Sequence, residues 1–300
     1  MNTTRSRRHW RREKFLPYLL LAPALVLLAG MIYPFGLGFY YSFTSYWLQY
    51  PNRFRFVWLD NYISLIEEPL FVRALEFTLG FTLAAVVVQV GLGLAVALLL
   101  HGRIPARNVI RALMLLPLMM PPVITALMWK IMMASTNAGI LNHMLSFLGV
   151  DPVNWFGSTE GAVVSILIID TWGNLPFVAL ILLGGLQALP TEPYEAARVD
   201  GAGPAAILRY VTLPLLSPFL VLVVLFRTMD SLRIFDVIYA TTMGGPNDAT
   251  TNLHIMAYQY SFQWYQMGKG MAQAIVLLLL VVIVSYLLMR LWNRASESTS

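Results

Sequence analysis

The 300-residue sequence contains no cysteine and few charged residues, and both shortages limit what it can be. Without cysteine there is no disulfide framework and no thiolate metal site. Only 12% of the residues are charged and 58% are hydrophobic, whereas about 25% charged residues is usual for a soluble domain. A chain this apolar cannot cover its surface with polar groups in water, so lipid is the solvent that suits it. The composition predicts an all-α polytopic bundle of membrane helices.

The sequence also lacks the residue patterns of catalytic, metal and nucleotide sites. It has three lysines, and Gly268-Lys269-Gly270 lacks the rest of a phosphate-binding loop. The histidines are scattered through tails and loops without the spacing of metal ligands: His9, His101, His143 and His254. We therefore expect no enzyme activity and no bound cofactor or metal. Any process that needs ATP would draw its energy from another chain.

Apolar runs of about 20 residues, enough to cross a bilayer, occur six times in the sequence. They lie near 16–43, 77–100, 111–133, 162–187, 215–240 and 270–292. The first is longer than the apolar part of a signal peptide and has no clean cleavage site after it, so we interpret it as a retained helix. Pro117, Pro121 and Pro122 predict a kink or local unwinding in the third. Two small-residue pairs in the second, Gly80/Ala84 and Gly91/Ala95, predict close helix packing.

The basic residues between these runs predict the orientation in the membrane. The 134–161 loop has no Lys or Arg, and the 241–269 loop has only Lys269. The segments on the other side hold most of the positive charge, namely Arg5, Arg7, Arg8, Arg11, Arg12, Lys14, Arg103, Arg107, Arg111, Arg198, Arg209, Arg290 and Arg294. The positive-inside rule then places both termini and the 188–214 loop in the cytoplasm. The basic N-terminus is a topology signal in contact with lipid headgroups rather than a nucleic-acid site.

Charged residues inside the apolar runs are the next informative feature. Asp170 lies in the fourth run, and Arg227, Asp230, Arg233 and Asp236 lie in the fifth. Ionisable groups at this depth are costly and mark a functional interior by default. On one regular helix Arg227 and Asp236 lie about 180° apart, so all four cannot face one pore. Two readings stay open: an ion-pair ladder, since neighbours of opposite sign are three residues apart, and a polar pathway.

Depth in the membrane suggests one particular neighbour for Asp170. Counted at about 1.5 Å per residue from the outer helix ends, Asp170 and Arg233 lie at similar depth, so we expect them to be close or to share a cavity. Trp172 and Asn174 accompany Asp170 in the stretch DTWGNLPF. An aromatic face with hydrogen-bonding side chains suits a polyhydroxylated ligand. The alternative is a buried helix contact.

The loop between the fourth and fifth runs, 188–214, is too long for a simple connector, and most of it lies in the stretch EAARVDGAGPAAILRYVTLPLLSP at 195–218. Thr191 can cap a short helix whose first turn holds Glu192 and Glu195. Gly201 and Gly203 can end it, and a second short helix can start at Pro204. These signals favour a compact helix-turn-helix that docks on another protein, with a mere connector as the alternative.

The same loop resembles the EAA motif of permease subunits of bacterial ABC importers. The matching residues are Glu195, Ala196, Ala197, Asp200, Gly201, Ala202, Leu213 and Pro214. A second stretch, FDVIYATTMGGP at 235–246, resembles the end of the fifth core helix in carbohydrate importers of the maltose type. FRTMDSLRIFD resembles the permeases for trehalose and similar disaccharides. The stretch at 235–246 departs from the commoner family pattern at Ala240 and Thr241.

The resemblance implies a function and a set of partners. Residues Glu195, Ala196, Ala197, Asp200, Gly201 and Ala202 would form the coupling helix, seated on a separate ATPase dimer that binds ATP and Mg. A second homologous permease would complete the pore, and an extracytoplasmic solute-binding protein would deliver the sugar. The substrate pathway would include Asp170, Trp172, Asn174, Asp230, Arg233 and Asp236. The expected location is the bacterial cytoplasmic (inner) membrane.

The resemblance also predicts how the chain is divided. We expect a basic tail (1–15), a first transmembrane helix with an external loop (16–76), a core permease domain (77–292) that contains the coupling loop 188–214, and a second cytoplasmic tail (293–300). Two other functions stay open: a permease of the same family for another solute such as glycerol phosphate, and an ion-coupled secondary carrier. The first would favour an unpaired cationic patch. The second would require an internal repeat, and no clear one is visible.

Overall fold

The computed structural model describes residues 4–52, 54–102, 105–136 and 139–297, and in this part of the chain it describes side chains except those of 4–17, 19, 291 and 294–297. The predicted topology signals at 5–14, 103 and 294 therefore lie outside the described side chains. The described residues form helices and connecting loops without a β-strand. The all-α prediction is confirmed, whereas the predicted division into tails, outer loop and core stays a prediction.

Fifteen helical segments follow one another in the described residues, two of them π-helical (η). They are α1 (Thr4–Ser42), α2 (Asp60–Ile66), α3 (Pro69–His101), α4 (Arg107–Met119), α5 (Pro122–Met132), α6 (Ile140–Ser146), α7 (Thr159–Ala188), α8 (Glu192–Val199), α9 (Pro204–Ile207), η1 (Leu208–Thr212), α10 (Leu213–Leu232), α11 (Asp236–Thr241), α12 (Leu253–Tyr258), η2 (Gln259–Gln263) and α13 (Met267–Glu297).

Five stretches of the described chain are long and apolar enough to cross a membrane: Leu20–Ser42, Pro69–His101, Thr159–Ala188, Pro204–Leu232 and Met267–Arg290. The α4–α5 pair gives a sixth if it is counted as one broken span, since the two helices meet at 99°. The bend lies at Met120, whose backbone is extended, as the residue before a proline prefers. The predicted break in the third run is thus confirmed.

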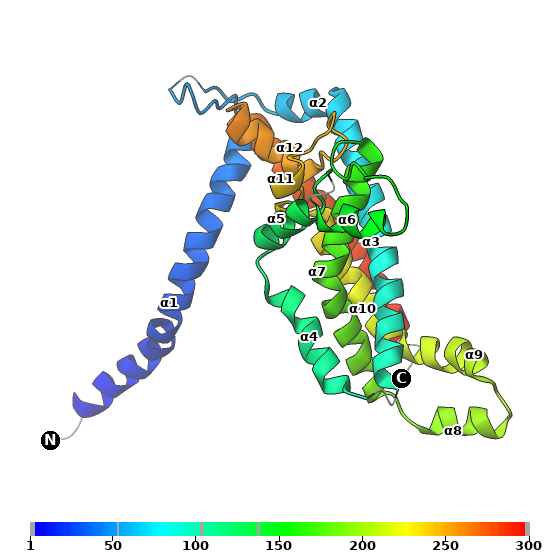
Figure 1. Ribbon diagram of the computed structural model, residues 1–300. Coiled ribbons are helices and arrows are strands. Elements are labelled where there is room, and N and C mark those ends of the chain that lie inside the picture. The colour runs from blue at the N-terminus through cyan, green and yellow to red at the C-terminus, as the bar shows by residue number, and fades with distance from the viewer. Residues whose placement is uncertain (1–3, 53, 103–104, 137–138, 298–300) are drawn as a thin grey trace.

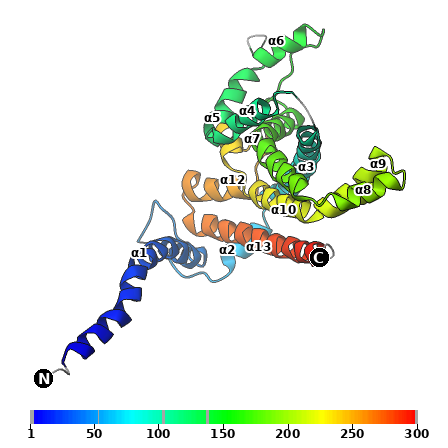
Figure 2. The same ribbon diagram turned by 90° about the horizontal axis from the view of Figure 1, so that it is seen from below.

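The ends of the bundle carry different elements. Figure 1 shows α8 and α9 projecting from one end, where the first turns of α1 and the last turns of α13 also lie, while α2 and α12 lie toward the other. Seen from below, α1 lies at the outer edge of the structure, where it contacts α13 (Figure 2). The first turns of α1, the last turns of α13 and the 188–214 loop therefore lie toward one end of the bundle. The location of the two termini, and the compartment that they face, stay predictions.

A close helix contact joins α3 and α7 through Gly93. A Cβ built on Gly93 would lie 2.3 Å from Cγ1 of Val178, so the two backbones approach only because this residue has no side chain. The predicted packing glycines are wrong in this chain. Gly80 and Gly91 have open space within 4 Å, because both lie on exposed positions of α3. The correct small residues, Gly93 and Ala97, are two residues further on than Gly91 and Ala95 and face inward.

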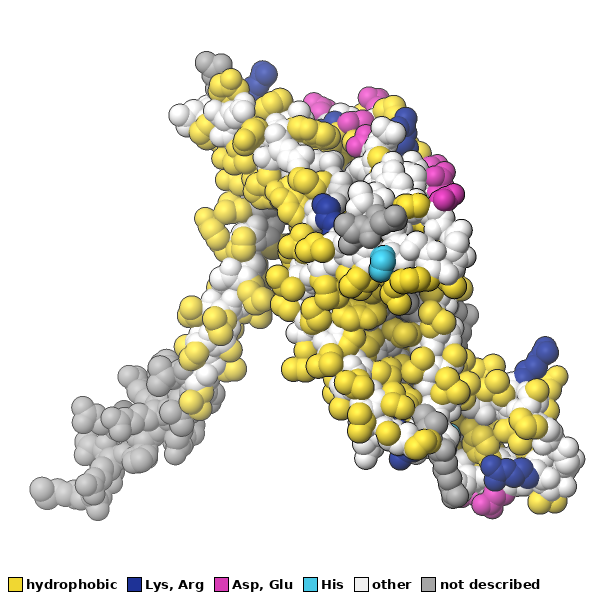
Figure 3. All heavy atoms as spheres, viewed as in Figure 1, with side chains coloured by type: hydrophobic (Ala, Val, Ile, Leu, Met, Phe, Trp, Pro, Cys, Tyr) yellow, Lys and Arg dark blue, Asp and Glu magenta, His cyan; other side chains and the backbone are white. Residues whose placement is uncertain are grey.

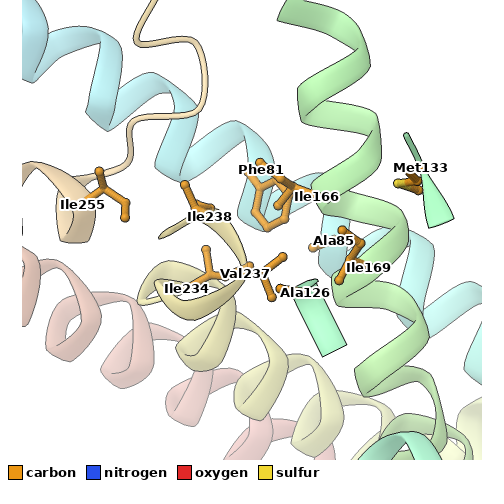
Figure 4. Packing of buried hydrophobic residues seen from close by; sticks show 10 residues of the cluster. All are labelled: Phe81, Ala85, Ala126, Met133, Ile166, Ile169, Ile234, Val237, Ile238 and Ile255. Carbon is orange, nitrogen blue, oxygen red and sulfur yellow. The ribbon is translucent and has the colours of Figure 1, made fainter. Parts of the chain in front are cut away.

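Apolar side chains dominate both the surface and the interior. On the face seen in Figure 3, hydrophobic side chains cover the middle of the molecule and charged ones gather toward its two ends, as a membrane requires. Inside, one core cluster joins α3, α5, α7 and α11, with Phe81, Ala126, Ile166 and Ile238 pointing toward one another (Figure 4). This cluster fixes the short α11 against three longer helices.

The fifth predicted run, 215–240, does not form one helix. It ends at Leu232, and α11 begins after a break at Arg233, Ile234 and Phe235. The carbonyls freed by the break are paired from α12: His254 Nδ1 lies 2.9 Å from the Arg233 carbonyl oxygen, and Asn252 Nδ2 donates to Ile234 at 2.5 Å. Buried backbone groups need such partners, and here side chains supply them.

Candidate functional site: a charged cavity at a helix break

A cavity of about 500 Å³ lies beside this break. Six helices and the break itself line it, so it is assembled from distant parts of the sequence. The lining residues are Pro117, Leu118 and Met120 of the α4 end, Pro122 and Thr125 of α5, Ile169, Asp170, Gly173 and Asn174 of α7, Arg227 and Asp230 of α10, Arg233, Ile234 and Phe235 of the break, Asp236 and Val237 of α11, and His254 of α12.

Arg227 is the centre of a buried polar network on one wall of this cavity. Its Nη2 lies 3.0 Å from Asp170 Oδ2, and its Nε donates to Gln89 Oε1 at 2.6 Å. Gln89 in turn donates to Asp170 at 2.7 Å, and Nη2 also donates to Ser231 at 3.2 Å. Asn174 completes the set by donating to Asp170 Oδ1 at 2.9 Å. The network therefore joins α3, α7 and α10 through groups that satisfy one another.

A second ion pair lies on the open side of the cavity. Arg233 Nη2 is 2.7 Å from Asp230 Oδ1, and the other carboxylate oxygen of Asp230 lies 3.6 Å from Arg227 Nη1. The expectation that Asp170 and Arg233 share a cavity is confirmed. A direct pairing between them is wrong, because Arg227 already binds Asp170 and Arg233 reaches the nearer Asp230.

The helix break also changes the geometry expected for the four charges of the fifth run. On a regular helix Arg227 and Asp236 would face opposite ways, yet both line this cavity. The chain turns between Leu232 and Asp236, which brings Asp236 back to the same side. Asp236 is exposed and makes no ion pair with a described residue. Both open readings hold in part: the arginines are paired, and all four groups line a polar space.

The aromatic residue that lines the cavity is Phe235 rather than the predicted Trp172. Trp172 packs edge to face against Trp129 of α5, at 5.9 Å between ring centroids, and does not line the cavity. The lining aromatic ring is Phe235, stacked on Tyr239 at 5.2 Å and close to Tyr258. The hydrogen bond between the two tyrosines, 3.1 Å long, raises the pKa of Tyr258, so its phenol stays protonated.

Sequence reasoning left two of the network residues, Gln89 and Ser231, outside the site. Gln89 is fully buried, and it is the one strongly polar side chain of the 77–100 run. An amide in the middle of a long apolar helix is costly unless it has a partner, and that was the available signal. The role of Arg227 as the partner of Asp170 depends on how α7 and α10 cross, which no local pattern encodes.

The predicted coupling segment lies at the opposite end of the bundle, on α8 and the turn after it. Glu195, Ala196 and Asp200 are exposed, and Ala197 and Ala202 are half-buried. Gly201 ends the helix with a φ of +77°, a left-handed backbone that suits glycine. Thr191 precedes α8 but makes no side-chain capping bond, so the predicted cap is wrong. Its backbone is helical, which turns the hydroxyl away from the free amides.

The second half of the loop also differs from the expected compact helix-turn-helix. The helix that starts at Pro204 runs through η1 into α10, so it is the first part of the fifth span rather than a separate helix. Tyr194 of α8 donates to Thr212 Oγ1 of η1 at 3.3 Å, and a groove of about 680 Å³ lies between α8, η1 and the adjoining ends of α3 and α7. A movement of α8 would thus reach η1, which continues into α10.

Comparison with known proteins agrees with this architecture. Residues 89–297 match the family described as binding-protein-dependent transport system inner membrane component. The trehalose/maltose transport system permease protein MalF of Thermococcus litoralis is 39% identical over 277 residues, which cover 92% of each chain. The trehalose transport system permease protein SugA of Mycobacterium tuberculosis is 32% identical over 95% of this chain and 91% of its own.

A solved structure gives the same fold. It is the bacterial alginate ABC transporter in complex with an alginate pentasaccharide-bound periplasmic protein, whose matching chain superimposes with a TM-score of 0.80 at 20% identity, over 94% of this chain and 96% of its own. The apolar helices and the family description locate the chain in the inner membrane. This chain belongs to the permeases of binding-protein-dependent ABC importers, within their carbohydrate branch.

Proposed function

We propose that the chain is one transmembrane permease subunit of an ABC importer that moves a neutral sugar inward by alternating access, a disaccharide such as trehalose or maltose being the first choice. The named relatives support a sugar, since trehalose and maltose occur in their names. The cavity beside the helix break would be part of the sugar pathway. Asp236, Asn174 and Arg233 would face the hydroxyl groups, and Phe235 would offer an aromatic face.

The charge pairing in the cavity is the observation that carries the choice of a neutral substrate. Both arginines that line it have carboxylate partners within 3.0 Å, and Asp236 adds an unpaired negative charge. A site for glycerol phosphate or another anion would need a cation free to bind it. The pairing thus argues against an anionic solute, and it leaves acceptors and donors for hydroxyl groups.

The partners follow from the same proposal. The ATPase subunits, with ATP and Mg, would bind at the α8 end of the bundle, where Glu195, Asp200 and the Gly201 turn are exposed. A second, homologous permease would complete the pore, and a sugar-loaded binding protein would dock on the opposite end. The alginate transporter, whose chain has the same fold, also forms a complex with a periplasmic protein. Both termini would be cytoplasmic. The chain would bind neither nucleic acid nor a cofactor of its own.

Uptake by the reconstituted transporter tests the proposal. Proteoliposomes holding both permeases and the ATPase, with the binding protein outside and ATP inside, should accumulate labelled trehalose or maltose and leave glycerol phosphate outside. Accumulation that continues without ATP, and stops when an ion gradient is collapsed, would establish the ion-coupled carrier instead. Uptake of glycerol phosphate in preference to every sugar of the panel would refute the neutral substrate.

The coupling role has its own test, in Tyr194 of α8. Tyr194→Phe removes the hydroxyl that bonds Thr212 and keeps the ring. We expect the intact complex to assemble and to hydrolyse ATP while sugar uptake per ATP falls about threefold, and Gly201→Leu should cause a larger loss because its left-handed backbone disfavours a side chain. Tyr210→Phe, on an exposed ring, is the matched control. Unchanged uptake in the Tyr194 variant would show that α8 transmits its movement by another contact.

A further inference from the structure

The segment between α5 and α7 contains an apolar surface that no other part of the chain covers. α6 presents Ile140 and Met144 on its outer face, and Phe147 and Leu148 follow in the turn after the helix, at spacings that continue the same face. Phe147 and Leu148 are 77% and 78% exposed, among the most exposed apolar side chains of the described residues. A surface of this kind needs a partner.

This surface is held in place rather than left loose. Asn142, on the inner face of α6, is fully buried and uses both ends of its amide. Its Nδ2 donates to the carbonyls of Ala134 and Val153, both at 3.0 Å, and its Oδ1 accepts from the Val153 amide and from Trp155 Nε1 at 3.1 and 3.0 Å. Leu141 packs against the core cluster on the same side. The fixed inner face leaves the apolar outer face pointing away from the bundle.

The position and charge of α6 identify what covers it. From Ile131 to Val150 the chain has no Lys, Arg, Asp or Glu, so no charge marks a polar protein interface or a water-facing helix. Figure 1 places α6 at the level of α5, below α2 and α12, and Figure 2 shows it at the edge of the bundle, far from α1 and α13. It therefore lies at the edge of the bundle, beside the ends of the spans that are farther from α8.

We propose that α6 is an interfacial helix whose outer face, Ile140 and Met144, is inserted into the outer leaflet of the membrane together with Phe147 and Leu148 of the turn that follows it. Amphipathic helices bind this layer by burying an apolar face at the boundary between headgroups and acyl chains. The two polar residues beside the apolar face, His143 and Ser146, would face the headgroups, and both are exposed. The insertion would fix the outer ends of α5 and α7, which α6 connects, at a constant depth.

Spin labels measure this depth, and the absence of cysteine makes the chain ready for them. Single variants Phe147→Cys and Leu148→Cys, with Ser146→Cys as the matched neighbour, would be labelled and reconstituted with the partner subunits in vesicles of three parts phosphatidylethanolamine and one part phosphatidylglycerol. We expect collisions with oxygen, which concentrates in lipid, to exceed collisions with a water-soluble nickel chelate at 147 and 148, by a ratio at least threefold above that at 146.

Two results would overturn the proposal. Dominant nickel collisions at 147 and 148 would place the face in water, and low collision rates with both reagents would show that another protein covers it. Neither reading depends on which solute is transported. A second measurement stands beside the labels: Phe147→Asp with Leu148→Asp should lower the yield of assembled transporter at least threefold, whereas His143→Asp with Ser146→Asp should leave it unchanged. Equal yields of the two double variants would also overturn insertion.

Discussion

Two ion pairs of the same chemistry line one cavity, and they differ in almost everything else. The side chains of Arg227 and Asp170 are 2% and 7% exposed, whereas those of Arg233 and Asp230 are 61% and 43% exposed. The buried pair joins two residues that are 57 positions apart in sequence and lie on different helices, and Gln89 binds both of them. The open pair links residues three apart at the end of one helix.

The difference teaches which pair holds the structure and which can meet a ligand. Removing one member of a buried pair leaves an uncompensated charge in an apolar interior, at a cost of about 3–5 kcal/mol. Breaking an exposed pair costs about 0–1 kcal/mol, because water replaces the partner. The buried pair therefore acts as a fixed wall of the cavity, and the open pair can exchange its internal hydrogen bond for one to a sugar hydroxyl.

Arg227→Met with Asp170 retained is the strongest test of the difference in stability between the two pairs. We expect a loss of about 3–5 kcal/mol of folding stability, seen as a strong fall in the amount of monodisperse protein after detergent extraction and in its thermal midpoint. Arg227→Met combined with Asp170→Asn should recover much of both, because no isolated charge remains. A single variant as stable as the native chain would show that the pair does not hold the helices.

Gln89→Leu should have the next largest effect. The change leaves Arg227 Nε without its acceptor and removes one donor to Asp170, and an unsatisfied buried group costs about 1–3 kcal/mol. The thermal midpoint should fall clearly, though less than in Arg227→Met. Gln263→Leu, at an exposed position, is the control. If both glutamine variants lowered the midpoint equally, the buried network would not be the cause.

Asp230→Asn probes the residue that contacts both arginines. It removes the carboxylate 2.7 Å from Arg233 and the longer 3.6 Å contact to Arg227, while Asp170 and Gln89 keep their bonds to Arg227. We expect a loss of stability under about 1 kcal/mol. Thermal unfolding in detergent measures it at low and high salt, and the small difference from the native chain should shrink as salt screens the exposed charges. A fall in the thermal midpoint as large as that of Arg227→Met would show that Asp230 belongs to the buried network that holds the helices together.

The smallest effect on stability is expected from Arg233→Met, whose side chain lies mostly in solvent. Its effect should appear in transport: KM for the sugar should rise about two- to tenfold, which corresponds to the ~0.5–1.5 kcal/mol of one hydrogen bond. Uptake kinetics in proteoliposomes measure it, with the extracted protein's thermal midpoint as the check on folding. An unchanged KM would remove Arg233 from the sugar pathway and leave the buried wall unaffected.

The sequence by itself determined that the chain lies in lipid, that it folds into helices, and which family it belongs to. Runs of about 20 apolar residues can satisfy their backbone groups in lipid only as helices, so composition and length predicted the all-α bundle. Pro121 and Pro122 predicted the break between α4 and α5, because proline acts on its own neighbours. The EAA stretch identified the family, which the matches to known permeases confirm.

Only the tertiary structure decided which residues meet. The sequence predicted a fifth helix to residue 240, whereas Asn252 and His254, on a later helix, support a break at Arg233. That break brings Asp236 to the cavity, and the crossing of α7 and α10 gives Asp170 to Arg227 rather than to Arg233. The packing glycine is Gly93 and not Gly91, because Gly93 lies on the face of α3 that packs against Val178 of α7. Local patterns describe what a residue can do, while contacts between distant helices select its partner, and burial sets how strong the resulting pair is.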